Sequence, residues 1–180
     1  PYAFAGWSDG GASPHPVTFP AVPTTYVATF LPQRPLTLTK LACSLRFDKT
    51  GRDRCTVRGT LGNVPAGFVT AGQPIVIDIG GARVPFTLDN RGRATGPNGS
   101  VAVIVPNGFG GGTVKLRVRL LNGSWAGALA DEGVNPNATV RNQPLSIDVA
   151  VPLVGTAVHS TTAGVMYRST AGKHGRWKLP

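Results

Sequence analysis

Apolar and basic side chains alternate along one segment of the chain, and this alternation limits the folds that are open to it. Val114, Leu116, Val118 and Leu120 occupy every second position, with Lys115, Arg117 and Arg119 between them. Successive side chains of a β-strand point to opposite faces of the sheet. The pattern therefore predicts a strand with one face in the core and the other in water.

The rest of the chain reads as short segments of the same kind, separated by turn residues. Gly and Pro supply 24 and 16 of the 180 residues without any G-x-y period, and Glu132 is the only glutamate. Such a composition, with abundant Thr and Val, is typical of many short strands joined by tight turns. We predict an all-β fold whose main domain, residues 36–180, is a β-sandwich-like unit.

The two cysteines flank a predicted hairpin. Cys43 and Cys55 lie on either side of LRFDKTGRDR, and a three-residue loop that pairs Phe47 with Gly51 would place them opposite each other. A disulfide between adjacent strands is the favoured interpretation, and it indicates an oxidising, extracytoplasmic location. The alternative is two small buried thiols. No histidine lies near enough in sequence to complete a zinc site.

One stretch has a helical pattern. SWAGALADEG, residues 124–133, predicts a short helix with Ser124 as its N-terminal cap, Trp125 and Leu129 facing inward, and Gly133 as its end.

A segment in the first half of the main domain has a similar counterpart in the second. Residues 73–79, QPIVIDI, return as QPLSIDV at residues 143–149. This spacing of about 70 residues suggests two similar β-halves, and a chance likeness is the alternative. Asp78 and Asp148 hold equivalent positions in the two segments. They either meet as a pair of carboxylates or face solvent or an arginine, and we favour the second arrangement.

The first thirty residues differ in pattern from the main domain. They run through FAGWSDGG and the strand pattern Val17–Phe19 to TYVATF. This segment resembles the second half of an InlB-type B-repeat, a small β-grasp-like module of bacterial surface and secreted proteins, without the opening strands of that module. The resemblance implies a partial repeat at 1–30 with Phe4, Trp7, Tyr26 and Phe30 in its core. Residues 31–35, LPQRP, read as a short linker, and residues 36–180 resemble uncharacterised β-domains of bacterial secreted proteins.

The formal charge of +10 points to an anionic partner. The basic residues are scattered, and no run resembles a basic arm or a recognition helix, so we expect no specific nucleic-acid recognition. An anionic polysaccharide is the partner we consider. No apolar run approaches the ~20 residues of a membrane helix, so no membrane span is expected.

The sequence gives little support for catalysis. The three histidines lie outside metal-binding motifs, and the glycine run at 108–112 lacks the lysine and the helix of a phosphate-binding loop. We expect no enzyme activity, no metal and no cofactor.

Two functions remain open. The first is a non-catalytic structural or adhesive module of a bacterial surface or secreted protein, in an extracellular or cell-surface location, which assembles with itself or with neighbouring domains by strand complementation. The second is a carbohydrate- or polyanion-binding module carried by a larger secreted enzyme. The candidate contact residues are Trp7, Lys173, His174, Arg176, Trp177 and Lys178. Of these, Trp177 near the chain end is the aromatic expected to be exposed for stacking on a sugar.

Overall fold

The computed structural model describes residues 1–9 and 20–180, and in this part of the chain the regular secondary structure is β-strand. The strands are β1 (Tyr2–Trp7), β2 (Ala28–Arg46), β3 (Asp53–Val64), β4 (Pro74–Ile79), β5 (Ala82–Thr87), β6 (Arg93–Gly96), β7 (Gly99–Ile104), β8 (Gly112–Gly123), β9 (Val140–Leu153), β10 (Ala157–Thr170) and β11 (His174–Lys178). The all-β prediction is confirmed. The described residues contain no helix of the length and apolarity that a membrane crossing requires.

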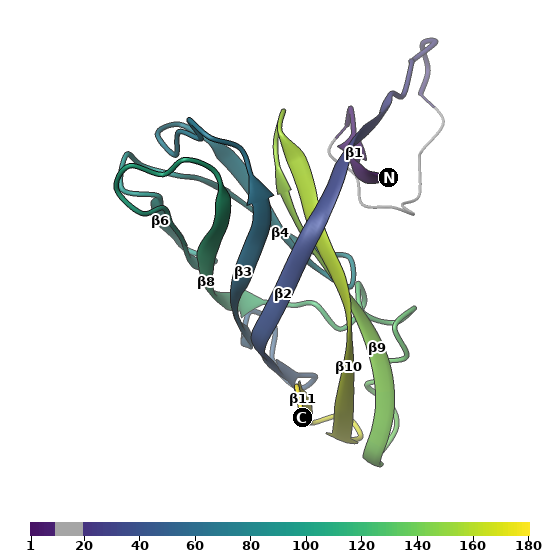
Figure 1. Ribbon diagram of the computed structural model, residues 1–180. Helices are drawn as coiled ribbons and strands as arrows, with labels where there is room; N and C mark the ends of the chain where they lie inside the picture. The colour runs from purple at the N-terminus through teal and green to yellow at the C-terminus, as the bar shows by residue number, and fades with distance from the viewer. Residues whose placement is uncertain (10–19) are drawn as a thin grey trace.

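The strands form one sheet that curls into a nearly closed barrel. Its order is β5-β4-β9-β10-β11-β2-β3-β8-β7-β6, and β1 is attached to β2. The end strands β5 and β6 come close to each other but do not pair. Figure 1 shows β2, β3 and β8 side by side, with β9 and β10 next to each other to their right. The main domain is thus one curved sheet, in place of two separate sheets.

The last strand fills a gap between two long strands. β2 and β10 pair in parallel only over a short stretch, where Gln33 to Pro35 lie beside Val158 to Ser160. Further along, β11 lies between them and is antiparallel to both. Gly175 in β11 makes this possible, since an added Cβ would lie 2.8 Å from the Tyr167 hydroxyl and 2.7 Å from the Phe47 ring.

The core lies inside the barrel and follows the alternation seen in the sequence. In β8, Val114, Leu116, Val118 and Leu120 are buried, whereas Lys115, Arg117 and Arg119 are exposed. The neighbouring strand β3 has the same pattern. Burying alternate apolar side chains and leaving the others in water is what a barrel with a dry interior requires.

The predicted disulfide is present. Cys43 and Cys55 are direct cross-strand partners in β2 and β3, with Cα atoms 4.2 Å apart, and they are bonded to each other. The predicted hairpin across residues 43–55 is therefore present, but its turn is longer than expected: Phe47 and Gly51 lie within the turn between β2 and β3 and are not cross-strand partners.

The two similar segments of the main domain become neighbouring strands. Residues 73–79 include β4 and residues 143–149 lie in β9, and β4 pairs with β9 in an antiparallel ladder. Their relation as duplicated halves stays a hypothesis.

The predicted helix at 124–133 is wrong. Trp125 and Leu129 are buried as expected, but the segment forms only consecutive turns. The hydroxyl of Ser124, the expected cap, instead accepts a hydrogen bond from the amide of Gly51, at 2.8 Å. The Trp125 amide donates to the buried carboxylate of Asp53, at 2.6 Å. Tertiary hydrogen bonds to Gly51 and Asp53 thus hold the start of this segment, which continues as turns.

The N-terminal residues form a hairpin that continues into the barrel. β1 pairs with the beginning of β2, and the Phe4 ring lies 5.6 Å from Trp7 and 5.9 Å from Phe30. Phe30 is 59% exposed, so this aromatic cluster is not a closed core. Residues 31–35, expected as a linker, lie within β2. The predicted strand at Val17–Phe19 falls outside the described residues.

A basic outer face and two hollows

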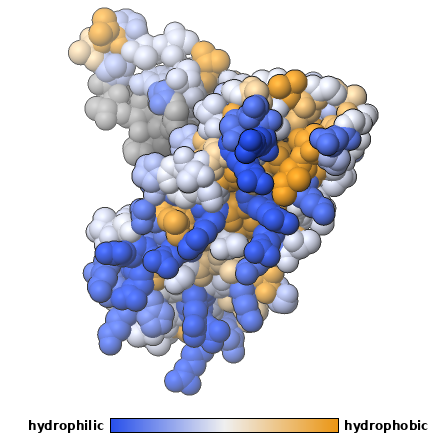
Figure 2. Space-filling view, turned by 90° about the vertical axis from the view of Figure 1, so that its left-hand side faces the viewer, coloured by the Kyte–Doolittle hydropathy of each residue, from blue (hydrophilic) through white to orange (hydrophobic). Residues whose placement is uncertain are grey.

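Many of the 18 lysines and arginines lie on the outer surface of neighbouring strands. Arg46 at the end of β2 pairs with Asp48 and is left aside, and ten others form one set. We call this set the basic face. It consists of the exposed side chains Lys40, Arg54, Arg58, Arg93, Lys115, Arg117, Arg119, Arg168, Arg176 and Lys178. They come from β2, β3, β6, β8, β10 and β11, which are brought together by the sheet order. Figure 2 shows hydrophilic side chains over much of the side on which β6 and β8 lie.

Several of these cations oppose one another directly across the sheet. Arg58 of β3 is the cross-strand partner of both Lys40 and Arg117, and Arg168 of β10 is the partner of Arg176. Like charges in directly opposite positions destabilise a sheet by about 0.2–1 kcal/mol a pair. These pairs of like charges therefore do not stabilise the folded protein.

Acidic side chains that would neutralise the basic face are lacking on its strands. β2, β6, β7, β8, β10 and β11 contain no Asp or Glu, and Asp53 of β3 points into the core. Within the part of the chain that the structure describes, none of the ten cations forms a salt bridge. Asp89, in the turn before β6, attracts Arg93, and apart from it the strands of the basic face supply no exposed acidic side chain to balance the positive charge.

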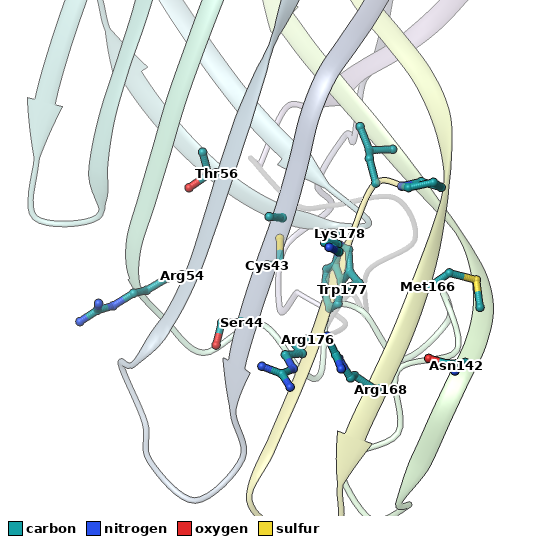
Figure 3. Close-up of a pocket in the computed structure, with 13 residues that line it drawn as sticks. Cys43, Ser44, Arg54, Thr56, Asn142, Met166, Arg168, Arg176, Trp177 and Lys178 are labelled. Carbon is teal, nitrogen blue, oxygen red and sulfur yellow. The ribbon is translucent and has the colours of Figure 1, made fainter.

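The basic face contains two adjoining hollows that share Thr56. The first, which we call hollow 1, has a volume of about 560 Å³ and lies over β10, β11, β2 and β3. Its cations are Arg54, Arg168, Arg176 and Lys178. Figure 3 shows Arg168 and Arg176 next to each other below Trp177, with Arg54 pointing away from them.

Hollow 2 has a volume of about 500 Å³ and lies over β2, β3, β8, β7 and β6. Its cations are Lys40, Arg58, Arg93, Arg117 and Arg119. Between Arg168 on β10 and Arg93 on β6 there are six steps from strand to strand. At about 4.8 Å a step, the two hollows span roughly 30 Å across the sheet.

The predicted contact residues are only partly brought together. Arg176 and Lys178 line hollow 1, and His174 is half-buried on the same strand opposite Arg46. Lys173 is exposed in the turn before β11. Trp7 pairs with Ala28 at the opposite end of β2 from hollow 1.

The expectation of an exposed Trp177 is wrong. Trp177 is only 3% exposed, and its ring packs inside the barrel at 6.2 Å from that of Tyr167. It alternates with Arg176 and Lys178 along β11, so it must point to the opposite face. Trp177 therefore presents no open ring face to a sugar.

Most cations of the basic face were missed by reasoning from sequence. Arg54, Arg58, Arg93 and Arg168 are scattered along the chain, and only the sheet order makes them neighbours. The available signal was the strict alternation of β3 and β8, which places every basic residue of the segments 54–58 and 115–119 on one face.

The carboxylates of the two similar segments lie away from the basic face, on β4 and β9. Asp78 accepts a hydrogen bond from the Gly81 amide at 3.0 Å and lies 3.8 Å from the Arg83 guanidinium, while Asp148 accepts one from the Thr162 hydroxyl at 2.6 Å. Burial raises the pKa of Asp78 and that of nearby Glu132, and the charge of Asp148 raises both further. The described residues offer no group of three metal ligands. The Asp78 carboxylate thus ties β4 to the turn that follows it, and the Asp148 carboxylate ties β9 to β10.

Comparison of the chain with models of protein families, with curated proteins and with solved structures found no match.

Proposed function

We propose that the chain is a non-catalytic, extracellular adhesive module that attaches a bacterial surface or secreted protein to an anionic polysaccharide. The observation behind this proposal is the basic face, on which like charges oppose one another without acidic partners. Such an arrangement costs stability, and a polyanion that lies across it removes the cost. Arginine suits this role because its guanidinium binds a carboxylate or sulfate through two parallel hydrogen bonds.

A polysaccharide fits the basic face better than a single-stranded nucleic acid does. Single-stranded nucleic acids are bound by stacking bases on aromatic side chains within a basic groove. The residues that line the two hollows include only one aromatic, Trp177, and its ring is buried. The disulfide between Cys43 and Cys55 supports an oxidising location outside the cytoplasm.

Besides binding a polysaccharide, such a module could also join neighbouring chains by strand complementation, and this stays a prediction. The β1–β2 hairpin favours it, because Tyr2 and Phe30 are 74% and 59% exposed beside the main sheet. The edge strands of the barrel are less suited to it. β5 contains Pro85, which cannot donate a backbone hydrogen bond, and β6 has only four residues. Both features oppose pairing with another strand.

Titration calorimetry with polygalacturonate tests the polysaccharide proposal. We expect binding of polygalacturonate at low salt, no binding of neutral dextran, and weaker binding of single-stranded DNA and of vesicles of anionic lipid. The double variant Arg58→Ser/Arg117→Ser is expected to lose about tenfold in affinity, since each exposed pair is worth about 0.2–1 kcal/mol.

The matched control is Arg91→Ser/Lys173→Ser, which removes the same charge from exposed positions that line neither hollow. If the two double variants lost equal affinity for polygalacturonate, net charge alone would account for the binding. That result, or tighter binding of DNA or vesicles than of polygalacturonate, would contradict the proposal.

A further inference from the structure

The two hollows of the basic face differ in chemistry. Hollow 2 is lined by five cations, and its only large apolar side chain with an exposed surface is Ile104. Hollow 1 combines its cations with the apolar side chains of Met166, Leu179 and Pro180. A polyanion needs only charge to bind in hollow 2, whereas hollow 1 presents both charge and an apolar wall.

The charged and apolar parts of hollow 1 are fixed next to each other by the β10–β11 ladder. Arg168 is the cross-strand partner of Arg176, and Met166 is the partner of Lys178 one outward position further along. Met166 is 43% exposed, so its side chain offers apolar surface on the outer side of the sheet beside these cations. A ligand in hollow 1 therefore meets two guanidinium groups together with the apolar side chain of Met166. Figure 3 shows Arg176 and Arg168 side by side, with Met166 to their right.

Two further features give hollow 1 a defined shape. The backbone of Leu179 donates a hydrogen bond to the Leu41 carbonyl at 2.8 Å, which holds the residues after β11 against the barrel. On the other side, Asn142 has a positive φ of 55° in β9, opposite the position where the β9–β10 register shifts. A bulge of this kind redirects a side chain, and Asn142 lines the hollow with its amide.

We infer that hollow 1 binds one acidic sugar residue of the polysaccharide, with its carboxylate at Arg168 and Arg176 and its ring carbons against Met166 and Leu179. The volume of about 560 Å³ lies within the ~300–1,000 Å³ of small-ligand sites. Ser44, Thr56 and Asn142 supply hydroxyl and amide groups for the sugar hydroxyls. Hollow 2 then holds the neighbouring residues of the polymer through charge alone. This inference rests on the proposed function.

A short ligand distinguishes the two hollows. Trigalacturonate is too short to need both, so it is titrated by calorimetry or by NMR shifts against the wild type and two double variants of equal charge. We expect Arg168→Ser/Arg176→Ser to weaken trigalacturonate binding at least tenfold and Arg58→Ser/Arg117→Ser to weaken it less than threefold. Neutral maltotriose and the peptide triglutamate serve as controls for the sugar and for the carboxylates, and both should bind at least tenfold more weakly.

Met166→Ser provides a second variant that changes no charge. It should weaken trigalacturonate binding about threefold or more and leave binding of triglutamate unchanged. Thermal melting of each variant checks that it is folded. Equal effects of the two double variants, or triglutamate binding as tight as trigalacturonate binding, would overturn the assignment of hollow 1 while polymer binding stands. If the wild-type protein itself does not bind polygalacturonate, the proposed function is overturned instead.

Discussion

At the scale of single residues, His159 is a buried group whose protonation should couple stability to pH. Its side chain is fully buried, and Nε2 lies 3.0 Å from the Gly62 carbonyl, to which it donates in the neutral tautomer. Nδ1 has no hydrogen-bond partner. Burial lowers the pKa of His159, and the charge of Arg34 lowers it further, although the Gly62 carbonyl acts in the opposite direction. A proton on Nδ1 would be buried without an acceptor.

We expect the protein to lose stability as the pH falls below about 6.5. Because the pKa of His159 is lower in the folded state, the unfolded state binds the proton more readily. The stabilisation by neutral His159 is therefore present above the unfolded-state pKa of about 6.5 and is lost as the pH falls toward the folded value. His159→Gln, which keeps a donor for Gly62, should flatten urea-unfolding free energies between pH 7.5 and 5.5. An equal pH dependence in the variant would rule out His159 as the source.

At the scale of elements, the β2–β3 hairpin is the support of the basic face. It contributes Lys40, Arg54 and Arg58 on its outer side and the Cys43–Cys55 disulfide on its inner side. At the start of β3, next to the turn of the hairpin, the buried carboxylate of Asp53 accepts hydrogen bonds from the amides of Arg46 and Trp125, at 2.7 and 2.6 Å. The disulfide and Asp53 together fix the strand register on which the cations depend.

Removal of the disulfide should destabilise the protein without abolishing polymer binding. The double variant Cys43→Ala/Cys55→Ala is expected to lose about 2–3 kcal/mol in unfolding free energy, because the bond closes a loop of 12 residues in the unfolded chain. Denaturant unfolding measures the loss, and polygalacturonate titration at 10 °C checks the binding. Unchanged stability would show that the ladder of β2 and β3 holds the register without the bond.

At the scale of the whole molecule, the net charge of +10 acts on both stability and binding. Ten cations on one face repel one another, and they also attract any polyanion over a distance set by screening. The Debye length falls from about 10 Å at 0.1 M salt to about 3 Å at 1 M. Salt therefore weakens the self-repulsion and the attraction together.

Raising sodium chloride from 0.1 to 1 M should change the two properties in opposite directions. We expect the melting temperature of the free protein to rise, and the affinity for polygalacturonate to fall at least tenfold. Calorimetry measures both, and the Arg58→Ser/Arg117→Ser variant should show a smaller rise in melting temperature. An affinity that does not depend on salt would contradict binding by the basic face.

The sequence alone determined the class of fold and several of its elements. Strict alternation in residues 114–120 required a strand with one wet face, and the spacing of Cys43 and Cys55 predicted their pairing across a hairpin. These features depend on residues that are near one another in the chain. In the segment 124–133, where a helix was predicted, Ser124 and Trp125 instead hydrogen-bond to Gly51 and Asp53, far away in sequence, and the backbone forms turns.

Only the tertiary structure decided where the charges gather. Arg168 and Arg176 are eight positions apart, whereas Arg58 and Arg117 are separated by 59, yet each pair is directly opposed in the sheet. The sequence pattern shows which side chains of a strand lie on the same face. It does not show which strands lie next to each other, because strand order depends on how the whole sheet closes. The same closure turned Trp177 inward and Arg176 outward, and so replaced the expected aromatic platform with a basic face.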